Sequence, residues 1–254
     1  MPTHVHLYTA DIQGDDGSLV VACCPICSSE SFQPYNGRAG AQCSRCKSLE
    51  RGRLLWLAMQ KLDLLRPGLR TLHLGPERFL MERLSASSGE LYHPCDVDPS
   101  RYRVGRMHVF PLDACADLAK LPSACFDLVI HNHVLEHLPC KPDDVLHEMA
   151  RVMVPGGTML FSVPFRGART DEDVSPELSD DDRRARFGQP DHLRVFGTRD
   201  FLPFAQKALQ AQDLVFRFRD HFSPEELALA AVPPDPDTRL TGYTIFVYHK
   251  PSTS

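Results

Sequence analysis

From residue 69 onward, short apolar segments alternate with segments of helical periodicity, and this alternation restricts the fold more than any other feature of the chain. Strands that alternate with helices are typical of a mostly parallel sheet covered by helices on both faces. Helices are predicted over 77–85, 143–153 and 199–211. Strands are predicted over residues 69–74, 90–95, 107–110, 126–130, 158–163, 213–218 and 243–249. The larger part of the chain is therefore expected to be a doubly wound α/β domain.

Residues suited to binding a ligand follow four of these strands. Gly75 ends the first, Asp96 the second, Asp113 the third, and His131 and His133 the fourth. Ligands of such sheets bind at the carboxyl ends of the strands. A glycine lets a ligand approach the backbone, and carboxylates accept hydrogen bonds from ribose hydroxyls or an adenine amine. The alternatives are a glycine needed only for a tight turn, aspartates that cap turns, and histidines that pack in the core.

Cysteines are concentrated near the N-terminus. The pair Cys24 and Cys27 is separated by fifteen residues from a second pair, Cys43 and Cys46. Two C-x-x-C turns at this separation are typical of a zinc ribbon, in which four thiolates complete a tetrahedral shell with no open position. We therefore predict a structural Zn²⁺ site. Cys23 competes with Cys24, but the C-P-x-C form favours Cys24.

The remaining cysteines, Cys95, Cys115, Cys125 and Cys140, show no pairing pattern, and we expect them to be reduced. Residues 1–18 are polar and carry acids, unlike a secretory leader, so a cytoplasmic location is expected. The odd number of cysteines also argues against a disulfide framework. No apolar run approaches the roughly 20 residues that span a bilayer. The net charge of −5 makes nucleic acid an unlikely partner. Nothing in the sequence indicates an oligomeric state.

A set of motifs resembles one enzyme family. The segments are 72–75 (Leu-His-Leu-Gly), Asp96, Leu112-Asp113 with Leu121-Pro122, 126–130 (Phe-Asp-Leu-Val-Ile), 134–137 (Val-Leu-Glu-His) and 151–157 (Arg-Val-Met-Val-Pro-Gly-Gly). In this order they resemble the successive motifs of class I S-adenosylmethionine-dependent methyltransferases. The cysteine pairs, together with residues 48–53 and 188–194, resemble a bacterial subgroup of that family that carries an N-terminal zinc ribbon.

The resemblance implies a Rossmann-like sheet of seven strands, with the last strand antiparallel. It places Gly75 under the methionine part of the cofactor, Asp96 on the ribose and Asp113 near the adenine. The cofactor-binding set that it implies is Gly75, Glu77, Asp96, Asp113, Ala114 and His131, with His133 on the substrate side. The glycine-rich loop of the family, G-x-G-x-G, has a single glycine here, in residues 75–79. Because of that departure, the sequence is also compatible with a non-catalytic protein that binds zinc and a nucleotide.

Residues 165–190 are rich in charges of both signs and too long for a simple connection. They are expected to form either a lid over the pocket or a disordered insertion. A polar group follows, with Asp191, His192 and Arg194 just before a predicted helix. Asp191 and His192 are candidates to activate an acceptor hydroxyl, and Arg194 to hold an anionic group. His131 is the rival general base.

Four regions are predicted: an N-terminal tail (1–18), a zinc-binding module (19–47), a connecting helix (48–68) and a methyltransferase domain (69–254). The leading hypothesis is methyl transfer from S-adenosylmethionine to a small-molecule acceptor. The alternatives are an RNA or protein methyltransferase that uses the ribbon to bind its substrate, and the non-catalytic module. The acceptor atom is not identified by the sequence.

Overall fold

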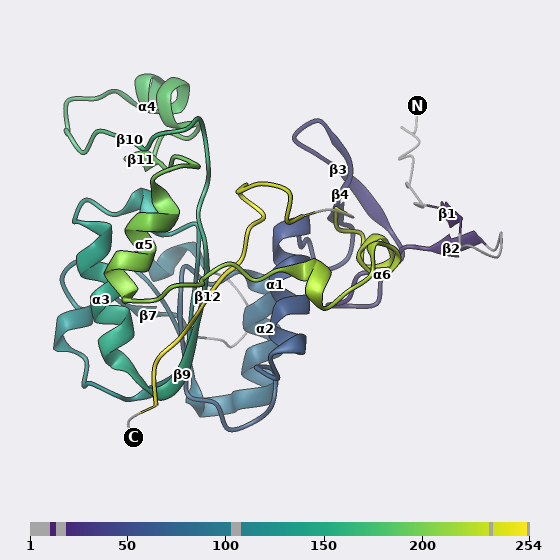
Figure 1. Ribbon diagram of the computed structural model, residues 1–254, viewed down its shortest axis with the longest axis horizontal. Helices are drawn as coiled ribbons and strands as arrows, with labels where there is room; N and C mark the ends of the chain where they lie inside the picture. Colours follow the sequence, from purple (N-terminus) through teal and green to yellow (C-terminus); the bar gives the residue numbers. More distant parts are fainter. Residues whose placement is uncertain (1–10, 14–18, 103–107, 234–235, 253–254) are drawn as a thin grey trace. The chain divides into compact units, whose positions relative to one another are not determined.

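The computed structural model describes residues 11–13, 19–102, 108–233 and 236–252 (Figure 1). The chain divides into two compact units. Unit 1 consists of Met1–Leu64 and Arg217–Arg239, and unit 2 of Leu65–Phe216 and Leu240–Ser254. Unit 1 therefore includes a segment that the sequence placed in the methyltransferase domain, and it also takes in most of the helix that was predicted to connect the two parts.

The core of unit 2 is a six-stranded sheet in the order β12-β9-β8-β5-β6-β7. All neighbouring strands are parallel except β12, which pairs antiparallel with β9. The strands are β5 (Thr71–Leu74), β6 (Tyr92–Asp96), β7 (Phe110–Pro111), β8 (Phe126–Asn132), β9 (Met153–Ser162) and β12 (Phe246–His249). This confirms the predicted α/β class and mostly parallel sheet.

The predicted count of seven strands is wrong for the described part of the chain. Residues 213–218 run beside β12 but form one isolated bridge, between Val215 and Phe246. Two backbone hydrogen bonds flank this bridge, from Phe216 to Ile245 and from Val247 to Leu214. The pairing stops there because the chain turns into a short 3₁₀ segment, η5 (Phe218–Asp220), which belongs to unit 1. The expected strand over 107–110 is shorter than predicted, and Met107 lies outside the described residues.

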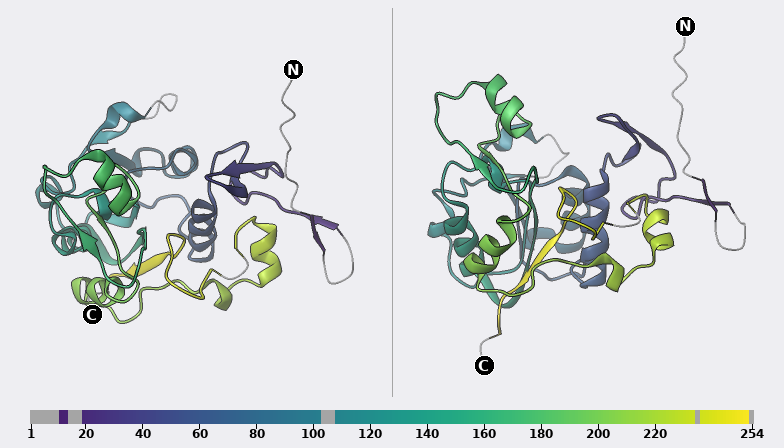
Figure 2. Two further views of the ribbon diagram at one scale, coloured as in Figure 1. Left: turned by 90° about the horizontal axis from the view of Figure 1, so that it is seen from above. Right: turned by 45° about the horizontal axis from the view of Figure 1, so that its top comes forward.

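Helices cover both faces of this sheet, as the alternating pattern requires. Helices α3 (Pro142–Val152) and α5 (Phe201–Leu209) pack together on one face, and α2 (Arg78–Ser88) lies on the other (Figures 1 and 2). Helix α3 has the predicted proline in its first turn, followed by two aspartates that favour the positive helix end. Four short 3₁₀ segments complete the connections: η1 (Gly89–Leu91), η2 (Pro99–Arg101), η3 (Leu118–Lys120) and η4 (Leu135–His137).

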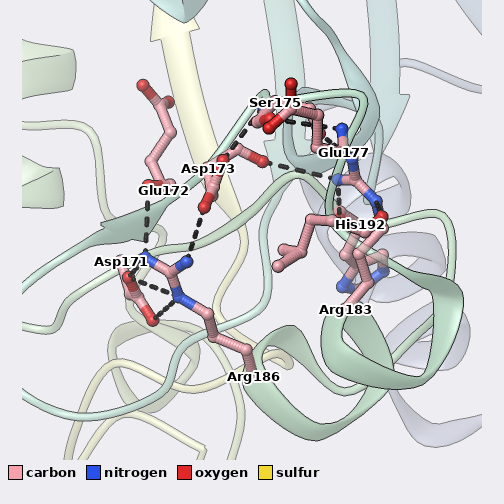
Figure 3. Close-up of polar contacts among 9 residues, drawn as sticks. Asp171, Glu172, Asp173, Ser175, Glu177, Arg183, Arg186 and His192 are labelled. Atoms are coloured by element: carbon pink, nitrogen blue, oxygen red, sulfur yellow. Dashed lines mark hydrogen bonds and ion pairs between the residues drawn. The ribbon is translucent and has the colours of Figure 1, made fainter.

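The charged insertion has a defined structure. It contains β10 (Asp171–Glu172), which pairs antiparallel with β11 (Arg194–Val195), and helix α4 (Asp180–Phe187). The Arg186 guanidinium donates to the carboxylates of Asp171 and Asp173 at 2.7 and 2.8 Å (Figure 3). The Arg186 guanidinium beside Asp171 lowers the pKa of that carboxyl. Two of the arginines of the insertion, Arg184 and Arg186, are thus paired with its aspartates.

Unit 1 is built around the cysteine pairs. A hairpin of β3 (Phe32–Tyr35) and β4 (Arg38–Cys43) leads into helix α1 (Glu50–Lys61). The unit also holds β1 (Asp11–Gln13), β2 (Leu19–Val21) and α6 (Pro224–Leu229). The segment from the C-terminal half is attached by a backbone hydrogen bond of 2.7 Å, which the N–H of Cys23 donates to the carbonyl of Leu229. Sequence spacing alone could not reveal this return of the chain.

Cys115 and Cys140 form a disulfide, so the expectation that both are reduced is wrong. The fold brings their Cα atoms to 5.8 Å although 25 residues separate them in sequence. The bond joins the loop after β7 to the turn before α3. Among the described residues, no helix is long and apolar enough to cross a membrane.

Candidate active site

Unit 2 has a pocket of about 460 Å³ at the carboxyl ends of its parallel strands. It lies where β5 is flanked by β6 on one side and β8 on the other. Such a reversal of strand order is the usual ligand position in an open α/β sheet. The residues lining it are Leu74, Gly75, Cys95, Asp96, Val97, Arg101, Tyr102, Leu112, Asp113, Ala114, His133, Val134, His137, Leu138, Pro139 and Asp191.

Gly75 forms the turn that leaves β5 toward α2. Its φ of +58° is in the left-handed region, and a Cβ at this position would lie 3.1 Å from Cγ2 of Val134. Its N–H donates to the carbonyl of Cys95, which joins the ends of two neighbouring strands. A side chain here would therefore be strained, and the glycine leaves backbone exposed to the pocket.

The carboxylate of Asp96, at the end of β6, is held in a fixed orientation. It accepts hydrogen bonds from the N–H of Asp98 at 2.9 Å and from the hydroxyl of Tyr102 at 2.6 Å. Each bond uses a different oxygen, so each oxygen keeps a further lone pair for a ligand. Next to it the side chain of Val97 is 70% exposed and lines the same pocket. A carboxylate beside an exposed apolar surface suits a ligand with polar and apolar faces.

Asp113 and Ala114, which follow β7, form another part of the pocket wall. Asp113 Oδ1 accepts from the N–H of Cys115 at 2.8 Å, while the N–H of Asp113 donates to Asp117. The aspartate therefore does cap a turn, which was the alternative considered from the sequence. The turn also leaves the residue at the wall of the pocket.

Two residues predicted to bind the cofactor do not line this pocket. Glu77 turns back to the sheet, with Oε2 3.1 Å from Nε2 of the buried His73. His131 is fully buried in the core and stacks on Phe161 with the ring centroids 5.0 Å apart. Burial, together with nearby His73, lowers the pKa of His131 to about 3. A neutral ring without access to solvent is poorly placed to act as a general base.

Beside the pocket lies a cluster of four ionisable side chains. Glu136 and His137 come from η4, while Asp191 and His192 come from the loop between α4 and β11. His133 contributes a fifth group, with Nδ1 3.1 Å from Oε1 of Glu136. His133, His137 and Asp191 reach the pocket wall, whereas Glu136 and His192 are buried behind it. The structure therefore brings His133 into the same cluster as Asp191 and His192, which the sequence predicted as a separate polar group.

Arg194 has a different position from the one predicted. It is 1% exposed, and its guanidinium donates to the carbonyls of Leu135 and Leu138, both at 2.6 Å, and to that of Cys140 at 3.4 Å. Its Nε donates to Glu172. Because these bonds occupy the guanidinium, Arg194 organises the loop that carries Glu136 and His137 and has little capacity left for a substrate anion.

A second pocket of about 470 Å³ lies on the α5 side of this loop. Pro139 lines both pockets, and Cys140 of the disulfide lines the second. Its other lining residues are Lys141, Pro142, Asp143, Thr170, Glu172, Val174, Arg194, Phe196, Asp200, Phe201 and Phe204. The charged insertion therefore forms part of a ligand-sized cavity.

The four predicted metal ligands of unit 1, Cys24, Cys27, Cys43 and Cys46, converge. Their sulfur atoms all lie within 4.8 Å of one another. The Sγ atoms of Cys24 and Cys46 are 3.7 Å apart, and those of Cys27 and Cys43 are 3.5 Å apart. A tetrahedral Zn²⁺ with bonds of about 2.3 Å requires sulfur atoms about 3.8 Å apart. The donor set therefore fits zinc.

Two residues that the sequence did not single out support this cluster. The hydroxyl of Ser48 lies 3.1 Å from Sγ of Cys46, and Leu49 occupies the N-cap of α1. Arg53 is fully buried and donates to the carbonyls of Ser48, Ala41 and Ala231. The helical pattern showed that residue 53 lies in a helix, but gave no signal that a charged side chain there would be buried.

Residues 76–161 match a family model described as a methyltransferase domain. A malonyl-[acyl-carrier protein] O-methyltransferase of Herminiimonas arsenicoxydans is 39% identical over 77 residues, which are 29% of this chain. The match spans 28% of that relative's length.

Similar solved structures include a SAM-dependent methyltransferase from Archaeoglobus fulgidus, at 16% identity and a TM-score of 0.47, with 79% of this chain and 94% of that chain covered. The YcgJ protein from Bacillus subtilis is 14% identical with a TM-score of 0.48, with 80% and 100% covered. The family match contains the strand ends that carry Asp96, Asp113 and Glu136. The match to a methyltransferase domain therefore runs from the turn after β5 into β9 of unit 2.

Proposed function

We propose that the chain transfers a methyl group from S-adenosylmethionine to a small-molecule acceptor, and that a structural zinc ion stabilises unit 1. One observation above all supports the proposed methyl transfer. Gly75, Asp96 and Asp113, predicted from three different strand ends, line one pocket at the reversal of strand order. Most of that pocket lies within the methyltransferase domain.

The pocket offers suitable groups for each part of the cofactor. Asp96 would accept from the ribose hydroxyls, and the backbone at Gly75 would border the methionine part. Asp113 would accept from the adenine amine, with Val97 and Ala114 as apolar contacts for the ring. The bound cofactor supplies an electrophilic methyl group. The chain itself then has to align an acceptor with that group, which is the main requirement of a direct displacement.

The second pocket supports a small-molecule acceptor. Its volume is in the range of ligand cavities, and Phe196, Phe201 and Phe204 give it an apolar wall. Of the predicted catalytic residues, Asp191 lies at the wall of the first pocket with its side chain 56% exposed, so it can accept a proton from an acceptor. The relative from Herminiimonas arsenicoxydans is named for an acyl-carrier-protein substrate. An acceptor presented on a carrier is a variant of the same proposal.

In unit 1, Cys24, Cys27, Cys43 and Cys46 would hold the zinc. The fit of the sulfur distances supports this assignment. A shell closed by four thiolates leaves no position for substrate, so the ion would stabilise the fold and take no part in the reaction. The buried guanidinium of Arg53 places a positive charge near this anionic cluster.

Calorimetric titration with S-adenosylhomocysteine tests the proposal. Wild type should bind one equivalent, and Asp96→Asn should bind about 10- to 100-fold more weakly, the effect of losing hydrogen bonds to a charged group. Asp98→Asn is the matched control, because this exposed neighbour does not line the pocket. Absence of binding by wild type would exclude the function. Weakening by Asp98→Asn alone would move the ribose site to that residue.

A further inference from the structure

The group beside the cofactor pocket has the composition of a metal site. Glu136, His137 and His192 each offer one ligand atom, and these three atoms lie within 4.8 Å of one another. Two come from η4 and the third from the loop before β11, more than fifty residues later. The loop that presents them is fixed by Arg194, which donates to the carbonyls of Leu135 and Leu138.

Glu136 is the first indication that a cation is bound. Its side chain is fully buried, and among the described residues neither carboxylate oxygen has a hydrogen-bond donor in acceptable geometry. A buried carboxylate without donors is strongly unfavourable, because it loses its hydration and gains nothing in return. A cation at this position would remove that cost.

The two histidines are oriented as metal ligands are. Nδ1 of His137 is 3.1 Å from the carbonyl oxygen of Asp191, and Nδ1 of His192 is 3.1 Å from that of Phe187. Carbonyl oxygens only accept, so both Nδ1 atoms carry the proton, and each neutral ring keeps a lone pair on Nε2. Histidine ligands usually donate their other N–H to a carbonyl or carboxylate in this way.

His133 is the side chain that approaches the carboxylate of Glu136 at Oε1. Its Nε2 lies 3.2 Å from the carbonyl of Gly242 and must donate to it, so Nδ1 of the neutral ring has a lone pair. That lone pair is 3.1 Å from Oε1 of Glu136. Two acceptors so close require a positive charge, supplied either by a proton on this pair or by a nearby metal ion.

We propose that Glu136, His137 and His192 bind a divalent transition-metal ion. Two imidazoles and one carboxylate suit Zn²⁺, Fe²⁺ or Co²⁺ and leave coordination positions open. His137 is the ligand nearest to solvent, with its side chain 35% exposed and lining the cofactor pocket. Water or an oxygen of the acceptor could reach the ion from the side of His137. This role toward an acceptor rests on the proposed function, whereas the metal site itself does not.

The test uses full-length protein whose cysteine cluster is first loaded with Zn²⁺, followed by titration with Co²⁺ and detection by visible absorption and calorimetry. Wild type should bind one further equivalent, with the weak absorption of nitrogen and oxygen ligands and without thiolate charge-transfer bands. His192→Ala and Glu136→Gln should each weaken this binding more than about tenfold. His147→Ala is the matched control, because this histidine lies exposed on α3 outside the cluster.

Thermal unfolding distinguishes a variant that has lost the metal site from a variant that does not fold. Co²⁺ should raise the Tm of wild type and His147→Ala by mass action, and should leave the Tm of the two cluster variants unchanged. Folded wild type without saturable Co²⁺ binding would overturn the proposal and assign the charge to a proton shared by His133 and Glu136. Equal binding by all variants would overturn it too. Titration with S-adenosylhomocysteine is read separately, so failure of cofactor binding would refute the proposed function and leave the metal site standing.

Discussion

The two candidate metal clusters, one in each unit, were visible in the sequence to very different degrees. The four cysteines of unit 1 lie within 23 residues, and their spacing alone predicts the ligand set. The cluster in unit 2 joins η4 to a residue 55 positions after its second member, so no local spacing indicates it. Local turns assemble the first cluster, whereas the sheet and the insertion assemble the second. The difference predicts that loss of metal should unfold unit 1 but only loosen a preformed site in unit 2.

The largest effect is expected at the cysteines. Cys43→Ser removes one of the four thiolates, so unit 1 should no longer hold zinc. Without the metal it should no longer unfold in a cooperative transition, because zinc binding to such sites contributes about 10–16 kcal/mol to the stability of the folded module. Metal content and denaturant unfolding measure this. The adjacent Cys23→Ser is the matched control, because that residue is outside the cluster. If Cys43→Ser keeps stoichiometric zinc while Cys23→Ser loses it, the ligand set is wrong.

A smaller loss of stability, still large for a single residue, is expected when the buried Arg194 of unit 2 is replaced. Arg194→Met leaves the carbonyls of Leu135 and Leu138 without this donor, which should lower the free energy of unfolding by about 2–6 kcal/mol, since each buried acceptor left unsatisfied costs about 1–3 kcal/mol. The control is Arg186→Met on the exposed face of the insertion, where ion pairs contribute little to stability. Similar losses in both variants would show that Arg194 does not organise the loop.

The disulfide should come next. Cys115→Ser opens a loop that the disulfide closes over a sequence separation of 25, and the lost chain entropy corresponds to about 3.5 kcal/mol under oxidising conditions. A thiol reductant should lower the stability of wild type by a similar amount and leave Cys115→Ser unaffected. Cys125→Ser, a free cysteine of the same unit, is the control. Wild type that is insensitive to reductant would show that the bond does not form in solution.

The sequence predicted what depends on local patterns. The alternation gave the sheet, the spacing gave the cysteine cluster, and strand ends gave Gly75, Asp96 and Asp113 as neighbours. It failed where a long-range contact decides. The direction of Glu77 depends on the buried His73, and the disulfide depends on two loops that meet only in the fold.

Arg194 shows the same limit. A charged residue in a polar segment suggested a contact with substrate, but the surrounding carbonyls of residues 135–140 bind it instead. Its burial could be known only from the position of η4.

The effect that should be smallest near neutral pH is at His131, and it is measured as a pH dependence. The ring is fully buried, neither nitrogen has a hydrogen-bond partner among the described residues, and its folded-state pKa is about 3, against about 6.5 when unfolded. Protons therefore prefer the unfolded chain. Native stability from the neutral ring is complete above pH 6.5 and is lost as the pH falls toward 3.

His131→Phe keeps an aromatic ring against Phe161 and removes this titration. Repacking shifts the stability of this variant by a constant amount, but its stability relative to wild type should grow by about 1.4 kcal/mol per pH unit below 6.5. Urea unfolding from pH 7 to pH 4 measures the slope, with His147→Ala as the control. A constant difference between the His131→Phe variant and wild type would mean that the ring is protonated in the folded state, and His131 would again be a candidate base.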